Sequence, residues 1–457
     1  MKYFFCGIGG IGMSSIARLL VHRGHAVTGS DRSFDQGLNA QTKKELIDAG
    51  MTLFPQDGSG VMPDTDYVIV SSAVEETIPD VQKALQSGVL ILKRAQLLAS
   101  LFNTCTGIAI GGTSGKTTIT AMTAHILYEA GLDPTMMNGG ISLNTYHGEK
   151  NSNLICGQSD ICVIEADESD GSIELYEPAV SVVSNISLDH KPLAELKTLF
   201  KNFIAKARLG AVINDDCPHL KSLHALHPHL VTFSTQPLST AHFTASDIQT
   251  TPDGTTFKIN GADAFLPLFG HHNVENALAA VAACSFLNVS LQTAVRALKT
   301  FKGTKRRIEC IGTVRGISVF DDYAHNPEKI KATLRTLRQK EHRLWVFFQP
   351  HGFAPTRLMK KELIQVFATE SFPQDMIYFP PIFYVGGTVA KDISSQDLVD
   401  GLAELGKKAF LADTRDVFVK AVQKAAAGDR IVIMGARDNT LTDLAKEILT
   451  VLKEKHT

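Results

Sequence analysis

Residues 111–118 carry the sequence Gly-Gly-Thr-Ser-Gly-Lys-Thr-Thr between an expected strand and an expected helix. The backbone amides of such a loop can surround phosphate oxygens, while Lys116 can reach the β- and γ-phosphates and Thr117 can hold Mg²⁺. The usual first glycine is isoleucine at position 110, but the core Gly-x-x-Gly-Lys-Thr is intact. A lysine followed by two hydroxyls is hard to explain by packing, so we predict a nucleoside-phosphate site. Its residues are Gly112, Thr113, Ser114, Gly115, Lys116, Thr117 and Thr118.

Two further strands of the same unit are followed by polar side chains. The expected strand 161–165 ends at Glu165, and the expected strand 180–185 leads to Asp189 and His190. Because ligands bind beyond the carboxyl ends of parallel strands, Glu165 and His190 should meet the phosphate loop. An acid and a histidine can complete the shell of Mg²⁺, although oxygen ligands are preferred. The acidic residues after Glu165 are interpreted either as part of this site or as a solvated loop; they are Asp167, Glu168 and Asp170.

A second glycine turn lies at the start of the chain. Gly7, Gly9 and Gly12 form the pattern Gly-x-Gly-x-x-Gly between an apolar strand and the expected helix 11–23. These glycines permit a tight turn and let backbone amides approach a diphosphate at the helix N-terminus. Asp31 ends the next strand, where an acid that binds ribose lies in dinucleotide folds. The pattern alone favours NAD as much as another diphosphate. The alternative is a glycine turn that has only a structural role and binds no ligand.

Short apolar strands alternate with amphipathic helices along the whole chain, which predicts an α/β fold with parallel sheets. At ~150 residues per domain, a chain of 457 residues predicts about three domains. We expect boundaries that give units 1–104, 105–302 and 303–457, with a polar linker at 301–307. In the third unit, strands are expected at 317–320, 344–348 and 430–434.

The composition excludes several classes of protein. The formal net charge is −2 and no basic run alternates with aromatic residues, so we expect no nucleic-acid partner. No apolar run reaches the ~18 residues of a membrane-spanning helix, and the N-terminus lacks the pattern of a signal peptide. Seven cysteines without Cys-x-x-Cys spacing favour free thiols and a cytoplasmic location.

Ordered motifs over some 350 residues resemble the Mur ligases, the ATP-dependent amide-forming enzymes of peptidoglycan precursor synthesis. The motifs of the first two units are GIGGIGMSSIA at 7–17, VTGSD at 27–31, SSA at 71–73, GTSGKTT at 112–118, DPTMMNGG at 133–140, EADESD at 165–170 and DH at 189–190. Later motifs are HNVENALAA at 272–280, KRRIE at 305–309, DDYAHNP at 321–327 and FQPH at 348–351. Within the family, the chain is most similar to the branch that adds L-alanine to UDP-N-acetylmuramate.

The resemblance implies an N-terminal Rossmann-like domain for the UDP-sugar, a central phosphate-loop domain for ATP and a C-terminal Rossmann-like domain for the amino acid. The lactyl carboxylate would attack the γ-phosphate of ATP, and the amine of the amino acid would displace phosphate from the acyl phosphate. Catalysis would require domain closure. The turn would then bind UDP rather than NAD, through Gly7, Gly9, Gly10, Gly12, Ser30, Asp31 and Ser71.

The resemblance also implies roles for single residues. Lys116 and an arginine would neutralise the charge of two reacting anions. Thr117 and Glu165 would hold one Mg²⁺, and His190 would hold or orient a second. Asn273 would contact adenine, Asp322 the ribose, and Arg306 or Arg307 the γ-phosphate. In the third unit, the residues expected at the amino acid are His325, His351 and Arg357.

The departures from the family pattern gather at the amino-acid end. The alanine-adding branch usually has histidines where this chain has Ser114 and Asn326, and arginines where it has Gly352 and Pro355. Losing an arginine clamp should cost affinity on the order of 1.5–3 kcal/mol unless another cation replaces it. Arg357 is one candidate for that replacement. Arg437, where a glycine is usual, is the other.

Several alternatives stay open. A sister ligase could add another amino acid or a murein tripeptide; the first glycine turn and the run at 71–73 favour the alanine-adding branch, whereas the altered region 351–357 does not. An NAD-dependent oxidoreductase leaves Lys116 and Glu165 unexplained, and an inactive nucleotide-binding regulator leaves them without a purpose. Lys206 lies near where some Mur ligases carry a carbamylated lysine, but we interpret it as a lysine on a helix surface.

Overall fold

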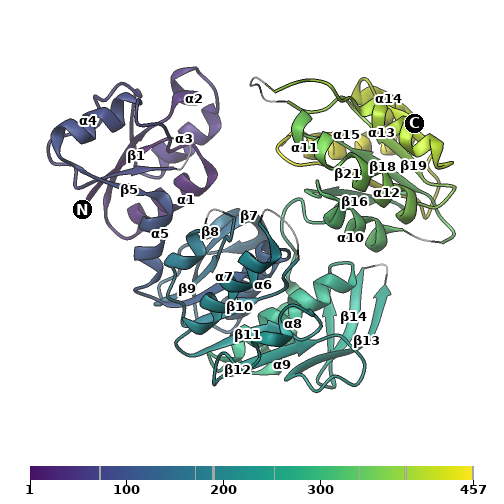
Figure 1. Ribbon diagram of the computed structural model, residues 1–457, viewed down its shortest axis with the longest axis horizontal. Coiled ribbons are helices and arrows are strands. Elements are labelled where there is room, and N and C mark those ends of the chain that lie inside the picture. Colours follow the sequence, from purple (N-terminus) through teal and green to yellow (C-terminus); the bar gives the residue numbers. More distant parts are fainter. Residues whose placement is uncertain are drawn as a thin grey trace. The chain divides into compact units, whose positions relative to one another are not determined.

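The computed structural model describes residues 1–454 apart from 72–73, 170, 188–190, 252, 339, 385 and 387–388, and leaves the side chains of 150 and 151 undescribed. The chain forms two compact units. The first holds Met1–Asp247, Phe257–Phe265 and Val274–Phe301, and the second holds Ile248–Thr256, Leu266–Asn273 and Lys302–Thr457. Three sheets with helices between their strands follow one another along the chain (Figure 1). The predicted α/β class is confirmed.

The N-terminal sheet is parallel and has the strand order β3-β2-β1-β4-β5. Its strands are β1 (Lys2–Cys6), β2 (Ala26–Ser30), β3 (Thr52–Phe54), β4 (Tyr67–Val70) and β5 (Leu90–Lys93). Its helices are α1 (Ile11–His22), α2 (Arg32–Asp35), α3 (Ala40–Asp48), α4 (Pro79–Ser87) and α5 (Arg94–Phe102). The strand order reverses between β1 and β4, which is where open α/β sheets bind their ligands.

The central sheet has ten strands in the order β15-β14-β13-β12-β11-β10-β6-β9-β7-β8. The strands are β6 (Thr106–Gly111), β7 (Thr135–Tyr146), β8 (Glu149–Ile155), β9 (Ile161–Glu165), β10 (Val180–Val183), β11 (Gly210–Asn214), β12 (Leu230–Ser234), β13 (Phe243–Thr251), β14 (Gly254–Ile259) and β15 (Ala262–Leu266). The helices are α6 (Lys116–Glu129), α7 (Leu193–Ala205), α8 (His271–Ser285) and α9 (Leu291–Thr300), with short 3₁₀ turns at Ser172–Leu175 and Lys221–Leu223. The strand before the phosphate loop, β6, therefore lies between β10 and β9.

The C-terminal sheet has the order β16-β17-β21-β18-β19-β20. Its strands are β16 (Glu309–Val314), β17 (Ile317–Asp322), β18 (Leu344–Phe348), β19 (Met376–Phe379), β20 (Ala409–Leu411) and β21 (Arg430–Met434). Its helices are α10 (Pro327–Leu337), α11 (Phe353–Leu358), α12 (Lys360–Glu370), α13 (Ser395–Glu404), α14 (Arg415–Val422) and α15 (Leu441–Glu454). Among the described strands of this sheet, β16 alone runs antiparallel, against β17.

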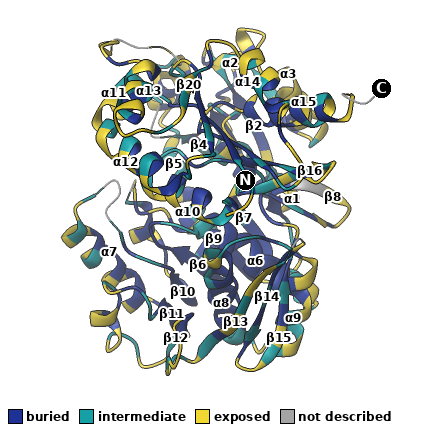
Figure 2. Cartoon of the chain, turned by 90° about the vertical axis from the view of Figure 1, so that its right-hand side faces the viewer, coloured by how far each residue is buried: buried dark blue, intermediate teal, exposed yellow. Residues whose placement is uncertain are grey.

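The sequence of β18 shows why this sheet forms. Val346 and Phe348 enter one apolar core while Trp345 and Phe347 enter another. Side chains alternate between the faces of a strand, and a parallel sheet covered by helices on both faces needs apolar residues throughout. Figure 2 accordingly shows the inner strands, such as β10 and β11, as buried.

The segment 301–307, predicted as a polar linker, is largely buried. Phe301 is fully buried, and Thr304 and Arg306 are 2% and 7% exposed. The polar and basic composition predicted a linker. Within the second unit, the side chain of Arg306 is buried and donates hydrogen bonds to Asp321, Gly435 and Asp438.

Candidate functional site

The phosphate loop follows β6 and ends where α6 begins at Lys116. Gly112 and Gly115 have φ angles of +124° and +90°, which residues with a Cβ atom rarely adopt. A Cβ on Gly112 would lie 2.2 Å from the hydroxyl of Ser184, and one on Gly115 would lie 2.6 Å from Oδ1 of Asn276. Both glycines are therefore required by the backbone conformation and by the lack of space.

The segment after the neighbouring strand β10 holds this loop in place. The amide of Thr113 donates to the carbonyl of Asn185 at 3.1 Å, and the amide of Ser114 donates to Asn185 Oδ1 at 2.9 Å. The hydroxyl of Ser184 and the side-chain amide of Asn185 both donate to the Ser114 carbonyl. The loop is thus preformed, which lowers the entropic cost of binding a phosphate.

Lys116 forms an ion pair with the buried Glu168. Its ammonium lies 2.8 Å and 3.1 Å from the two carboxylate oxygens and 2.7 Å from the carbonyl of Gly112. Glu168 is only 4% exposed, so the interpretation of this residue as part of a solvated loop is wrong. Asp167, by contrast, is exposed. Asp170 and His190 lie outside the described residues.

Glu165 and Thr117 converge on two neighbouring residues of β7. The amide of Gly139 donates to Glu165 Oε1 at 3.0 Å, and the side chain of Asn138 donates to the Thr117 carbonyl at 3.1 Å. A carboxylate and a threonine hydroxyl near a phosphate loop are the oxygen donors that Mg²⁺ prefers, so these residues fit a Mg²⁺ site. Among the described residues, no group of three histidine, cysteine or acidic side chains could bind a metal alone. Phosphate oxygens and water would have to complete the shell.

The start of α8 carries two buried asparagines, of which the sequence singled out the first. Asn273 donates its side-chain amide to the carbonyl of Phe269 at 2.8 Å. Asn276 is 7% exposed and faces Gly115 of the phosphate loop. The spacing i, i+3 places the two on one face of the helix, a signal in HNVENALAA that could have pointed to Asn276.

The glycine turn of the N-terminal sheet is closed by its own aspartate. Asp31 accepts from the amide of Gly9 at 2.8 Å and caps α2 by accepting from the amide of Ser33. The amides of Gly7 and Ile8 both donate to the Ser30 carbonyl. We expected Asp31 to bind a ribose. In the structure, its carboxylate instead holds the turn in place.

Arg94 is a cation at this turn that the sequence did not reveal. A Cβ on Gly12 would lie 2.6 Å from Nη1 of Arg94, which begins α5. The third glycine therefore makes room for a guanidinium at the N-terminus of α1, where a diphosphate would bind. No local pattern links two residues so far apart in the chain.

The two serines predicted for the UDP-sugar differ in their surroundings. The hydroxyl of Ser30 is buried and donates to Asp80, so it supports the turn from beneath. Ser71 directly follows β4, the strand beside β1, and its partly exposed side chain lies at the same edge of the sheet as Gly7 and Gly10. Residues 72–73 of the SSA motif lie outside the described residues.

The two adjacent arginines of the third unit are not equivalent. Arg306 is buried, pairs with Asp321 and donates to the carbonyls of Gly435 and Asp438. Arg307 is partly exposed and stacks over the ring of Tyr323 at 5.3 Å. Arg307 is thus the better placed of the two to meet a phosphate. Asp322 is 5% exposed and accepts from the hydroxyl of Thr333, and burial raises its pKa, so a ribose would require it to change partner.

Two histidines meet at the carboxyl edge of the C-terminal sheet. The rings of His325 and His351 are 5.2 Å apart. Burial lowers the pKa of His325 to about 4 and also lowers the pKa of His351. Arg357, which we expected beside them, instead pairs with Asp392 and donates to the carbonyl of Ala390. Lys206 is exposed at the end of α7, and its ammonium donates to the carbonyl of Glu174.

Family models and curated relatives cover nearly the whole chain. Residues 2–105 match the Mur ligase family catalytic domain, 110–284 the Mur ligase middle domain and 306–437 the Mur ligase glutamate ligase domain. A UDP-N-acetylmuramate–L-alanine ligase of Solibacter usitatus is 36% identical over 94% of this chain and 92% of its own. The chain belongs to the Mur ligase family. A ligase of the same name from Desulforapulum autotrophicum is 33% identical over 98% of both chains.

Solved structures of Mur ligases agree with this assignment. The UDP-N-acetylmuramate–alanine ligase of Thermotoga maritima has 25% identity and a TM-score of 0.78 over 99% of both chains. A murein peptide ligase of Psychrobacter arcticus has 26% identity and a TM-score of 0.66 over 100% of both chains. Among the helices that the structure describes, none is long and apolar enough to cross a membrane.

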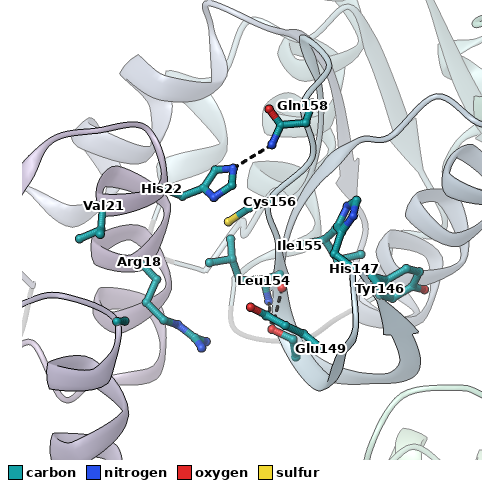
Figure 3. A pocket seen from close by; sticks show the side chains of 12 residues that line it. Arg18, Val21, His22, Tyr146, His147, Glu149, Leu154, Ile155, Cys156 and Gln158 are labelled. Carbon is teal, nitrogen blue, oxygen red and sulfur yellow. Dashed lines mark hydrogen bonds between the residues drawn. The ribbon is translucent and has the colours of Figure 1, made fainter.

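This Mur ligase also has a cavity of about 440 Å³ beside α1, separate from the predicted site residues. Figure 3 shows Arg18 and His22 of α1 facing the strand β8, which begins at Glu149, and Cys156, which directly follows that strand. His22 and Gln158 join its two sides through a 3.3 Å hydrogen bond. No residue that we expected to bind ATP, the UDP-sugar or the amino acid lines this cavity.

Proposed function

We propose that this chain is the ATP-dependent ligase that joins L-alanine to the lactyl carboxylate of UDP-N-acetylmuramate in peptidoglycan precursor synthesis. The observation that carries the proposal is the preformed loop with Lys116 at the first turn of α6, in a chain whose relatives over nearly its whole length are named for this reaction. An oxidoreductase would leave Lys116, Thr117 and Glu165 unexplained. We place the reaction in the cytoplasm, which its free cysteines suit.

The first step joins two anions and therefore needs their charges neutralised. A carboxylate oxygen attacks the γ-phosphorus, the bond from that phosphorus to the β–γ bridging oxygen breaks, and ADP leaves with the bonding electrons. The backbone amides of the loop bind the phosphates, and Lys116 moves from Glu168 to the phosphate oxygens. Thr117 and Glu165 would hold Mg²⁺, which, when bound, would offset the charge of the β- and γ-phosphates.

The second step is the attack of the amine on the acyl phosphate. The nitrogen bonds to the acyl carbon, the bond from that carbon to the phosphate oxygen breaks, and inorganic phosphate leaves while the amine loses a proton. The glycine turn and Arg94 would hold the UDP part of the sugar nucleotide, and the carboxyl edge of the C-terminal sheet would bind the amino acid.

A second candidate is a sister ligase that adds another amino acid or a peptide. The observation that favours it is the region after His351, where Gly352 and Pro355 replace two expected arginines and Arg357 is paired with Asp392. A pocket that lost its clamp could accept a substrate with its carboxylate elsewhere.

Release of ADP tests the proposal, measured with ATP, Mg²⁺ and UDP-N-acetylmuramate while one amino acid or murein tripeptide is added at a time. We expect turnover that requires both UDP-N-acetylmuramate and L-alanine. Turnover only with another amino acid or the tripeptide would favour the sister ligase. Turnover with none of them would contradict both candidates.

A further inference from the structure

Three side chains occupy equivalent places beyond three neighbouring strands of the C-terminal sheet. In register, Asp322 of β17 and Phe348 of β18 both pair with Met434 of β21, which lies between them. His325, Arg437 and His351 each follow their paired residue by three positions. Arg437 thus extends from the central strand, with one histidine on either side, and the two histidine rings are already in contact.

Arg437 is a cation without a counter-ion among the residues that the structure describes. It is exposed and makes no hydrogen bond or ion pair with them. The adjacent carboxylate of Asp438 is occupied by Arg415 at 2.7 Å and by Thr440. Burial and the charge of Arg437 lower the pKa of His351, and a histidine ring has no negative charge with which to balance the guanidinium.

The backbone of Arg437 is in an unusual conformation for its residue type. Its φ angle is +65°, in the left-handed region that favours glycine. Non-glycine residues in this region are strained and gather at functional sites, where the surrounding structure holds them. No hydrogen bond or ion pair between Arg437 and the described residues offsets this strain.

We propose that Arg437 binds the α-carboxylate of the amino acid substrate, and so takes the place of the two arginines that this chain lacks at 352 and 355. The inference rests on the proposed ligase function. A zwitterionic amino acid offers one carboxylate, and a guanidinium binds it through two parallel hydrogen bonds. Beside this edge, Oε1 of Gln349 is buried and accepts no hydrogen bond from the described residues, so it could accept one from the amine.

Arg357 is the weaker candidate for the same role. Its guanidinium is already bound to the carboxylate of Asp392 and to the carbonyl of Ala390. It would have to release both partners before it could bind a substrate, whereas Arg437 would gain a partner that it lacks.

The test compares the intact chain with Arg437→Gly and Arg437→Lys. Glycine removes the guanidinium and suits the φ angle of +65°, so the variant should fold with an unchanged or higher melting temperature. We expect Arg437→Gly to raise the KM for L-alanine by about ten- to hundred-fold, with the KM for ATP and for UDP-N-acetylmuramate unchanged. Arg437→Lys should lie between the two. The KM for L-alaninamide, which lacks the carboxylate, should change little between the intact chain and Arg437→Gly.

A matched control is Arg315→Gly. Arg315 is also an exposed arginine with a positive φ angle, +55°, but it lies in the turn before β17, at the opposite end of that strand. Its replacement should leave the KM for L-alanine unchanged. The inference is overturned if Arg437→Gly keeps the original KM for L-alanine. It is also overturned if this substitution raises the KM for L-alaninamide as much as the KM for L-alanine. A wild-type chain inactive with every amino acid would instead contradict the proposed function, and this inference with it.

Discussion

The ammonium of Lys116 lies 2.8 Å from one carboxylate oxygen of Glu168 and 3.1 Å from the other, with side chains only 15% and 5% exposed. The lysine that would contact the phosphates of ATP is therefore paired with an acid of its own chain. Each charge of the pair balances the other, and a phosphate that binds must replace the acid as the partner of the lysine. We therefore predict that stability and catalysis depend on the same ammonium group.

Replacing Lys116 by alanine should abolish turnover and also destabilise the fold. Glu168 would keep a buried carboxylate without a cation, which costs about 3 kcal/mol of unfolding free energy. The double variant Lys116→Ala/Glu168→Gln should regain most of that stability but no activity. Chemical denaturation and ADP release measure the two effects. A double variant no more stable than Lys116→Ala would show that the ion pair does not account for the loss of stability. If Lys116→Ala also lost UDP-N-acetylmuramate binding in calorimetry, the ATP and UDP-sugar sites would not be separate.

Adding a methyl group at Gly12 should displace Arg94 without unfolding the N-terminal sheet. The new Cβ would lie 2.6 Å from Nη1, which is the mobile end of the arginine side chain. Gly12→Ala should therefore lower the affinity for UDP-N-acetylmuramate about tenfold, as the loss of one charge-assisted contact would, and leave the affinity for ATP unchanged. Calorimetry measures both affinities. Arg94→Ala should cause a similar loss, and the double variant should lose little more. Additive losses would mean that Gly12 acts independently of Arg94.

The buried His125 should make the fold sensitive to acid. Burial lowers the pKa of His125 from 6.5 to about 4, and Nε2 lies 3.0 Å from the carbonyl of Ala297. Between these two values the unfolded chain binds a proton that the folded chain does not, so stability is full above pH 6.5 and falls as the pH drops, with a limiting slope of about 1.4 kcal/mol per pH unit. In denaturation curves, His125→Gln should reduce this dependence of stability on pH. The reduction should be partial, since burial also lowers the pKa of His325 to about 4. If the slope of unfolding free energy against pH were unchanged in His125→Gln, His125 would not be a source of the acid sensitivity.

Lys206 should be dispensable. Its side chain is exposed and donates to a backbone carbonyl, so Lys206→Ala should change the unfolding free energy by less than about 0.5 kcal/mol and leave turnover unaffected. Two comparisons check this: kcat of the variant against kcat of the wild type, and kcat of the wild type with and without added bicarbonate. A large loss of kcat, or a dependence of the wild type on bicarbonate, would favour the carbamylated lysine instead.

The sequence predicted the elements whose signal is local. The strands at 161–165, 344–348 and 430–434 were predicted with the bounds that the structure gives them, because each is a continuous apolar run. The two glycine loops were equally clear, since a positive φ angle or a close approach restricts the residue type. The antiparallel pair β7 and β8 was not predicted, because Asn138, Gly139 and Gly140 interrupt its pattern.

Partners between side chains far apart in the chain could not be predicted. Nothing local distinguishes Glu168, buried against Lys116, from the exposed Asp167 beside it. Likewise, Arg306 and Arg307 are neighbours in the sequence, but only the first is buried by Asp321 and two carbonyls. Each of these outcomes depends on tertiary packing, which composition and periodicity do not encode.

The most direct test of the central claim is a competition for a limiting amount of UDP-N-acetylmuramate. The chain is given ATP, Mg²⁺ and an equimolar mixture of L-alanine, glycine, L-serine and murein tripeptide, and the product is identified by its mass. We predict that UDP-N-acetylmuramate gains the mass of one alanine residue, with one ADP released per product. A product that carries another amino acid or the tripeptide, or consumption of ATP without an amide product, would contradict the claim.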